Sequence, residues 1–266
     1  MTISIETRFS FRLPAPGDVL LQFEAAAIPE QQLRQSDTSF SAGCRIARVS
    51  AEENIGERVW LRGEGTVEVA HRASVDVARL TPDLAALAAL DHHVLPGETV
   101  RYLFDSRYCP ADRFQSFVEA EFGGTAGGAR IAAVSGWVGE KFAYEWGSST
   151  SATTALDSFV ERRGVCRDFA HVVVTLARAS GIPARFVSCY APGVEPPDFH
   201  AVAEVFLADP AGGGGGAWCL VDATGMADPA QLVKIGVGRD AADVSFMTSF
   251  IMCEFLDKTI SVGVTG

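Results

Sequence analysis

One cysteine stands where the chain is predicted to turn into a helix. Cys166 follows Gly164 and Val165 and opens the segment CRDFAHVVVTLARASG. The first backbone N–H groups of a helix lack intrahelical partners, and the helix dipole adds positive charge, so this end favours an anionic thiolate. We predict that Cys166 is a nucleophile and that its backbone N–H donates to an oxyanion. The small Gly164 is expected to leave room for a substrate carbonyl.

A nucleophilic cysteine needs a base, and the base needs an acceptor that orients it. Of the five histidines, His200 begins the strand-like segment HAVAEVFLA, and Asp222 ends the next such segment, WCLVD. If the two segments pair as a hairpin, the start of the first lies beside the end of the second. The sequence therefore predicts a triad of Cys166, His200 and Asp222, separated by 34 and 22 residues.

Four further residues near Cys166 in the sequence are candidates for a role in the site. Asp168 and His171 follow Cys166 on the same helix, but a spacing of five does not place Cys166 and His171 on one helical face, so no metal site is expected. Asp168 in the first turn suits the helix dipole, and we expect it to support the loop around the site. Tyr144 and Trp146 are candidate cleft walls or oxyanion donors, with ordinary packing as the alternative.

The remaining cysteines carry no signal for chemistry. The chain has six cysteines, no CxxC pair and no signal peptide pattern, so neither a zinc ribbon nor a disulfide framework is expected. Free cysteine is among the most buried residue types and packs as a small hydrophobe. We assign that role to Cys44, Cys109, Cys189, Cys219 and Cys253.

The elements that must position the triad fall into two parts. Residues 1–80 alternate apolar and polar positions and carry turn residues at hairpin spacing, which predicts an antiparallel β-sandwich domain. Thr81 and Pro82 signal a helix start, so we place the boundary there and assign residues 81–266 to a catalytic core. Apolar periodicity predicts helices over 82–95, 111–122, 129–144, 153–163 and 166–180, and strands over 182–191, 200–208 and 218–222. Five glycines, 212–216, read as a hairpin loop without a phosphate-binding role.

Composition excludes several classes of protein. The chain has 266 residues, a hydrophobic content of 48% and a net charge of −11, which describes a folded, acidic protein and not a disordered one. Nucleic-acid binding needs a basic footprint, and none is present in the sequence. The sequence also lacks an apolar stretch long enough to span a membrane. A cytoplasmic location is the expectation, and the sequence carries no signal for an oligomeric state.

Several motifs together resemble a known family. The segments GVCRDFAHVVVTLARASGIPARFVSCY, HAVAEVF and VDATG resemble the bacterial transglutaminase-like superfamily, whose core is related to that of papain-like cysteine proteases. Looser similarity extends to residues 107–114 and 234–244, so the resemblance covers about residues 81–260 well and 1–80 weakly. The family's catalytic cysteine, histidine and aspartate match Cys166, His200 and Asp222. The chain reads HAV and DAT where the family usually reads HAW and DPT.

The resemblance implies an α+β fold with a transglutaminase/papain-like core and a cofactor-free thiol chemistry. It implies attack by Cys166 on a carboxamide or peptide bond to give a thioester, with a peptide or protein amide as substrate. Hydrolysis is the favoured outcome, which would make the protein a cysteine peptidase or amidase. Three alternatives stay open: transfer of the acyl group to an amine, an arylamine-type acetyltransferase, and a catalytically idle peptide-binding module on the same fold.

Overall fold

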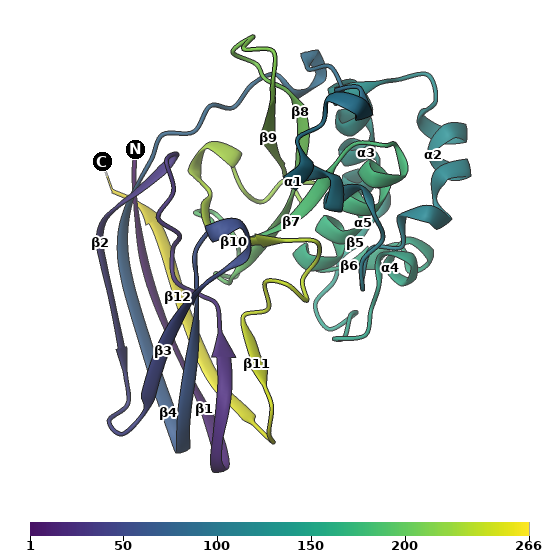
Figure 1. The fold of residues 1–266 in the computed structure, drawn as a ribbon. Coiled ribbons are helices and arrows are strands. Elements are labelled where there is room, and N and C mark those ends of the chain that lie inside the picture. The colour runs from purple at the N-terminus through teal and green to yellow at the C-terminus, as the bar shows by residue number, and fades with distance from the viewer. Residues whose placement is uncertain (266) are drawn as a thin grey trace.

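The first half of the molecule is an antiparallel sheet built on two very long strands. The computed structural model describes residues 1–265. In it β1 pairs with β4 along almost its whole length, and β2 and β3 pair with β4 further out, as Figure 1 shows. These strands are β1 (Thr2–Leu21), β2 (Gln31–Phe40), β3 (Arg45–Ser50) and β4 (Glu57–Val77).

The two long strands β1 and β4 are each bent, and side chains from the two sides of the bend pack in one cluster. The pairing of β1 with β4 shifts register between Leu13 and Gly17, where the sequence reads PAP, so each long strand is divided into two arms. One buried cluster draws side chains from both arms of both strands, among them Phe9, Leu21 and Leu61. Alternate residues of β1 are buried, as the sequence pattern predicts for strands with one covered face. The predicted fold class, an α+β protein with an N-terminal antiparallel β-domain, is confirmed.

The end of the chain returns to this first sheet. Strands β11 (Met247–Ser249) and β12 (Glu254–Val264) both pair with β1, and the two termini lie close together in Figure 1. The predicted division gave all of residues 81–266 to the core, whereas the strand pairing places residues 247–264 in the sheet of the N-terminal domain. The physical reason is that β12 satisfies the backbone groups along an edge of β1 that residues 1–80 leave unpaired.

The second half combines a four-stranded sheet with helices. Its strand order is β10-β7-β8-β9, and all neighbours are antiparallel. The strands are β7 (Ala184–Tyr190), β8 (His200–Ala208), β9 (Gly216–Val221) and β10 (Val233–Gly238), the short parallel pair is β5 (Ala143–Tyr144) and β6 (Arg163–Gly164), and the helices are α1 (Gly97–Val100), α2 (Gln115–Phe122), α3 (Gly127–Lys141), α4 (Ala155–Glu161) and α5 (Cys166–Ala179). Residues 209–215, with four of the five consecutive glycines, form the loop that joins β8 to β9, as predicted.

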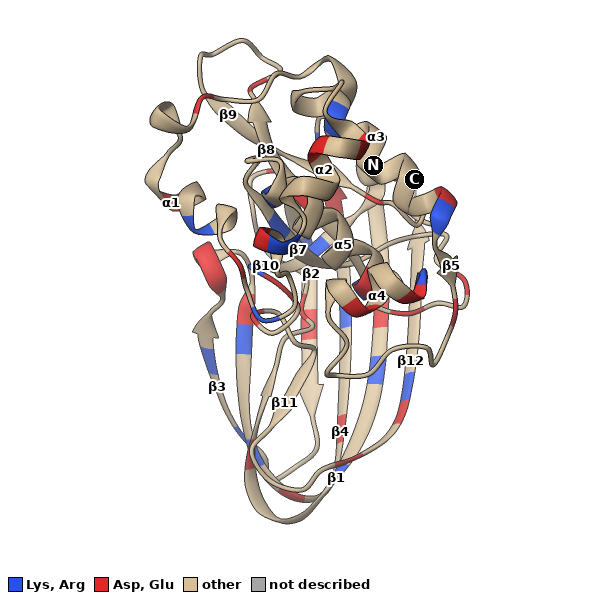
Figure 2. Cartoon of the chain, turned by 90° about the vertical axis from the view of Figure 1, so that its right-hand side faces the viewer, with Lys and Arg blue, Asp and Glu red and all other residues tan. Residues whose placement is uncertain are grey.

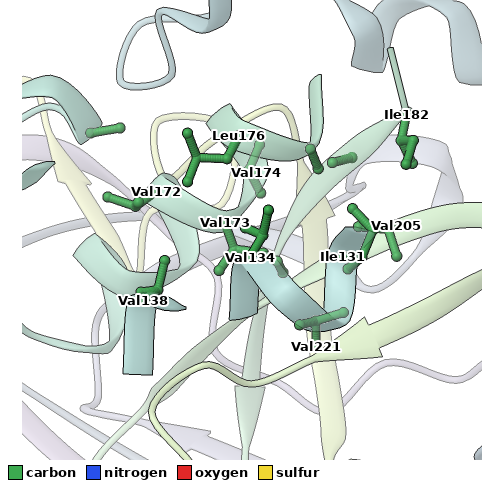
Figure 3. Packing of buried hydrophobic residues seen from close by; sticks show 14 of the residues in the cluster. Ile131, Val134, Val138, Val172, Val173, Val174, Leu176, Ile182, Val205 and Val221 are labelled. Carbon is green, nitrogen blue, oxygen red and sulfur yellow. The ribbon is translucent and has the colours of Figure 1, made fainter. Parts of the chain in front are cut away.

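Helix α5 forms the centre of the main core. Its side chains Val172, Val173, Val174 and Leu176 are all 1% exposed or less. They pack with side chains of α3, β8 and β9 in one apolar cluster (Figure 3). Because both the helix and the sheet bury one face in this cluster, the position of α5 over the sheet is fixed by apolar packing.

Two of the predicted helices are wrong in extent. Residues 82–95 form only short 3-10 turns at 84–86 and 92–94, because carbonyl groups of this segment accept hydrogen bonds from other elements: Leu87 from Gly128 and Ala88 from Ala208. The helix predicted over 129–144 ends at Lys141. There Ala143 donates to Arg162, which starts the short strand pair that leads to Cys166.

A buried ionic cluster joins the two halves of the molecule. The carboxylate of Glu204 on β8 contacts Arg185 at 2.7 Å and Lys234 at 2.5 Å, and its side chain is 1% exposed. Lys234 also contacts Glu30, which precedes β2 of the first sheet, at 2.6 Å. Burial raises the pKa of Glu204, but the two cations overcome that effect and lower it to about 2. The carboxylate is therefore charged at neutral pH and holds two cations in place.

At the surface, charges of both signs are mixed. Figure 2 shows basic and acidic positions interspersed along the strands of the first sheet, and ion pairs such as Arg72 with Glu6 at 3.0 Å follow from that arrangement. Such exposed pairs add little to stability. Among residues 1–265, no helix is both long and apolar enough to cross a membrane.

We expect Glu204→Ala to lower the free energy of unfolding by about 3–5 kcal/mol at pH 7, because it leaves two buried cations without their carboxylate. Urea unfolding measures the effect. The control is Glu254→Ala on β12, whose side chain is 64% exposed and lies 3.7 Å from Arg12, and whose loss should cost less than about 1 kcal/mol. Equal losses in the two variants would show that the buried cluster stabilises the protein no more than an exposed ion pair does.

The same comparison has a defined pH dependence. The folded-state pKa of Glu204 is lowered from 4.5 to about 2, so its contribution is complete above pH 4.5 and is lost as pH falls towards 2. The difference in unfolding free energy between the wild type and Glu204→Ala should therefore shrink below pH 4.5. A difference that stays constant down to pH 2.5 would contradict this origin.

Candidate active site

Cys166 is the first residue of α5, as the sequence predicts. The chain reaches it through β6, which runs parallel to β5 and places Tyr144 beside Gly164. Its thiol is half-buried and lines a cleft of about 410 Å³. At this helix end the backbone N–H groups have no intrahelical acceptor, so the arrangement can hold negative charge on the sulfur or on a neighbouring oxygen.

Gly164 has a different role from the predicted one. A Cβ atom at this position would lie 2.5 Å from the Cβ of Asp168 and 2.9 Å from its Oδ2. The missing side chain therefore makes room for Asp168 and not for a substrate carbonyl. Asp168 is buried, and its Oδ2 accepts a hydrogen bond of 2.9 Å from the backbone N–H of Val165. This contact fixes the turn that presents Cys166.

His200 and Asp222 are brought together by the predicted hairpin. Strands β8 and β9 pair with Ala203 opposite Val221, so Asp222 lies one step nearer to the start of β8. The Nε2 atom of His200 lies 3.0 Å from Oδ2 of Asp222. The Asp222 side chain is 3% exposed. The backbone N–H groups of Thr224 and Ala227 also donate to it, at 2.9 and 3.0 Å.

The electrostatics of this pair are set by burial and by the neighbouring thiol. Burial by itself lowers the pKa of His200, but the hydrogen bond to Asp222, the nearby Cys166 and the charges of both raise it to about 9. Burial raises the pKa of Asp222, and the contacts with His200 and Thr224 lower it below its ordinary value. The other imidazole nitrogen, Nδ1 of His200, is buried and has no hydrogen-bond partner among residues 1–265. It is the ring atom left for the thiol and a substrate.

The two aromatic candidates differ in their relation to the cysteine. Tyr144 is half-buried, and burial together with the charge and hydrogen bonding of Cys166 raises its pKa, so the phenol keeps its proton at neutral pH. Trp146 is 52% exposed and packs edge-on against Tyr144 with ring centroids 5.8 Å apart. Neither aromatic residue is among those that line the cleft, but the pKa of Tyr144 responds to Cys166.

The other cysteines occupy unreactive environments. All six are free. Burial raises the pKa of Cys109 and of Cys219 to about 11 and that of Cys189 well above its ordinary value. Cys44 and Cys253 are half-buried on the first sheet and pack against its apolar cluster. Cys166 alone among them lines the cleft that also contains His200.

The walls of the cleft come from segments that the sequence did not assign to the site. They include Arg107 and Tyr108 before α2, Arg167 on α5, and a stretch after β10 that contains Val244 and Phe246. Two of these segments, RYCPADRF and KIGVGRDAADV, resemble the bacterial family, which indicated that they matter. The resemblance did not indicate which of their side chains lie near Cys166. That information depends on how distant segments pack.

Helix α5 also holds these walls in place. His171 is buried, and its Nε2 accepts a 3.1 Å hydrogen bond from the backbone N–H of Ala241. Burial lowers the pKa of His171 well below its ordinary value, and Arg167 and Arg178 add to that shift, so the ring is neutral and can accept. Arg178 donates to the carbonyl oxygens of Phe104 and Arg239 at 3.0 and 2.6 Å. Both wall segments are thus tied to the helix that carries Cys166. Among residues 1–265, no group of three or more potential ligands could hold a metal ion.

We expect Gly164→Ala to lower the free energy of unfolding by about 1–3 kcal/mol through overpacking against Asp168. The matched control is Gly124→Ala, since a Cβ at Gly124 meets no atom within 4 Å. In the Asp168→Ala background the cost of Gly164→Ala should fall, which a double-mutant cycle in urea detects. Additive effects would show that Asp168 is not what requires the glycine.

Comparisons with known proteins give the family and the fold of this chain. The family model described as Transglutaminase-like superfamily matches residues 117–223, the range that holds Cys166, His200 and Asp222. A solved structure of a candidate cysteine protease from Cytophaga hutchinsonii is 30% identical, with a TM-score of 0.91 over 99% of this chain and 90% of that one.

Curated relatives match a smaller part of the chain. Uncharacterized proteins of Mycobacterium leprae (strain TN) and Mycobacterium tuberculosis (strain ATCC 25618 / H37Rv) are 31% and 33% identical over 43% and 46% of this chain. The match spans 42% of the length of each of these relatives. With the family model and the near-complete match to the solved structure, these similarities show that the chain belongs to the transglutaminase-like superfamily.

Proposed function

We propose that this protein is a thiol-dependent hydrolase that cleaves a carboxamide or peptide bond through Cys166, His200 and Asp222. The observation that carries the proposal is the state of His200. Its Nε2 is held by Asp222 at 3.0 Å, and its Nδ1 is buried without a partner next to a cleft that contains the thiol. A buried polar atom without a partner is costly, and a reacting thiol or leaving group would satisfy it.

The first half of the reaction uses the charges already described. The Cys166 thiolate attacks the carbonyl carbon, an Sγ–C bond forms, and the carbonyl oxygen becomes an oxyanion. We assign the Cys166 backbone N–H and the Tyr144 hydroxyl as the donors to that oxygen. The His200 imidazolium then gives its proton to the amine nitrogen as the C–N bond breaks, which leaves a thioester and a free amine.

The second half regenerates the thiol. His200, now neutral, takes a proton from water as the water oxygen attacks the thioester carbonyl. The C–S bond breaks, the acid product leaves, and the thiolate–imidazolium pair is restored. If an amine replaces water, the product is a new amide, and the protein is a transglutaminase. The candidate cysteine protease that shares the fold at 30% identity supports hydrolysis.

We expect a peptide library incubated with the wild type to give free-acid products that carry one water, read by mass spectrometry. Cys166→Ala should reduce their rate of formation by at least about 10³-fold, whereas Cys44→Ala, a half-buried cysteine outside the cleft, should not change it. A parallel incubation with a primary amine separates the outcomes. Amine adducts in place of acids would identify a transferase, and the lack of any Cys166-dependent product would favour a peptide-binding module.

We expect the His200 imidazole to titrate near pH 9 in an NMR titration of the wild type, since its pKa is raised to about 9. It therefore stays protonated through neutral pH and loses its proton above pH 9. In Asp222→Ala the stabilising acceptor is gone while burial remains, so the titration should move to lower pH. The stabilisation given by the pair should be complete below pH 6.5 and be lost as pH rises through 9. A wild-type titration at or below 6.5 would contradict the charged pair.

A further inference from the structure

Two guanidinium groups share one aromatic ring at the edge of the cleft. The guanidinium carbons of Arg107 and Arg167 lie 5.0 and 5.3 Å from the centroid of the Tyr108 ring. All three residues line the same cleft as Cys166 and His200. The Tyr108 ring attracts both cations, but the two like charges repel each other, and a bound anion would offset that repulsion.

The hydrogen-bonding capacity of this pair is only partly used. Arg107 is exposed and forms no ion pair with any carboxylate among residues 1–265. Arg167 donates through Nη2 to the carbonyl oxygens of Thr150 and Thr153, at 2.6 and 3.2 Å. Its Nε is buried and has no acceptor among residues 1–265. Arg107 therefore keeps its charge without a carboxylate partner, and Arg167 keeps one unused donor, among the described residues.

The neighbouring carboxylates all have partners already. Asp168 accepts from the backbone of Val165 through Oδ2 and forms an ion pair of 3.4 Å with Arg167 through Oδ1. Asp240 accepts from the backbone N–H groups of Tyr108 and Ala242, both at 2.9 Å. Asp222 holds His200. These carboxylates offset part of the local positive charge, but none of them forms an ion pair with Arg107.

The rest of the wall is mostly apolar. Phe186, Val244 and Phe246 line it, with small alanine and serine side chains between them. An aqueous cleft of about 410 Å³ with apolar walls and one cationic corner suits a short segment of peptide that carries a single negative group. A carboxylate is the group that a guanidinium binds best in a peptide, through two parallel N–H···O bonds.

Resting on the proposed function, we infer that the cleft selects a peptide or amide substrate with a carboxylate close to the scissile bond, bound by Arg107 with help from Arg167. The carboxylate can belong to an Asp or Glu side chain or to a C-terminus. Arg107 and Arg167 are thus specificity-determining residues. The reaction at Cys166 is unchanged by this inference, which concerns only what is brought to the thiol.

The test uses two alkylating probes that differ in one carboxylate: the α-amides of N-iodoacetyl-glutamate and of N-iodoacetyl-glutamine. The Cys166 thiolate forms an Sγ–C bond to the methylene carbon of either probe, the C–I bond breaks, and iodide leaves. Intact-protein and peptide mass spectrometry give the rate at Cys166. The measured quantity is the ratio of the glutamate rate to the glutamine rate, compared with the same ratio for N-acetylcysteine.

We expect the ratio at Cys166 to exceed that of N-acetylcysteine and to fall about three- to tenfold in Arg107→Gln, the range for a partly exposed ion pair that gains hydrogen bonds. Arg107→Lys should keep part of the ratio. Arg45→Gln on β3, which changes the net charge equally at an exposed position outside the cleft, should leave it unchanged. Since His200 is present in all variants, its own attraction for the anionic probe cancels from the comparison.

Ionic strength gives a second test on the wild type alone. Raising NaCl from about 0.05 M to about 0.5 M should lower the ratio of the glutamate rate to the glutamine rate, because salt screens exposed charges. A wild-type ratio equal to that of N-acetylcysteine, or one that Arg107→Gln leaves unchanged, overturns the inference. The glutamine probe alone tests the nucleophile, since a rate at Cys166 no higher than that of N-acetylcysteine at pH 6.5 counts against the proposed function and not against carboxylate selection.

Peptide pairs then distinguish the source of the carboxylate. One pair differs as Glu against Gln next to the scissile amide, and the other differs as a free against an amidated C-terminus. We expect one pair to show a preference for the acid that falls about three- to tenfold in Arg107→Gln. Equal turnover within both pairs would overturn the inference even if hydrolysis at Cys166 is found.

Discussion

The packing of α5 against the second sheet is the interaction on which the rest of the structure depends. Nearly every side chain of this helix after its first turn is buried, and the contact with β8 joins the segment that begins with Cys166 to the strand that begins with His200. Polar residues on the same helix extend that control outward. His171 and Arg178 hold the two loops that form the cleft walls. The apolar packing of α5 thus fixes the positions of Cys166 and His200 and the walls of the cleft that contains them.

The first sheet takes part in the cleft and is not an independent appendage. Tyr190 on β7 donates to the carbonyl of Phe23 at 2.6 Å, and Val233 and Ile235 on β10 pack among residues of β1 and β4. Lys234, which is held by the buried carboxylate of Glu204, adds an ionic link to Glu30 across the same boundary. The chain leaves the core by way of Phe246, a cleft residue, and enters the first sheet at β11. Motion of one half would therefore change the wall of the cleft.

The cleft contains basic side chains, although the net charge of the protein is negative. The chain as a whole is acidic, yet the cleft that contains Cys166 is also lined by His200, Arg107 and Arg167. The carboxylates close to it are turned towards backbone N–H groups or towards His200. The proposed anionic substrate group depends on this local field and not on the total charge of the protein.

The sequence by itself determined the elements whose signals are local. The alternation of apolar and polar residues predicted the strands of the first sheet, and a helix-start pattern predicted the position of Cys166. The hairpin pattern predicted that His200 lies beside Asp222. All three patterns are properties of short segments, so the sequence alone contains them. Tertiary structure alone decided the rest. Residues 82–95 do not form the predicted helix because their carbonyl groups accept hydrogen bonds from other elements. Residues 254–264, which were predicted to belong to the core, pair instead with the edge of β1. Arg107 and Arg167, sixty residues apart in the chain, approach the same Tyr108 ring only after folding. These features depend on contacts between distant segments, and such contacts follow from packing and not from any pattern within one segment.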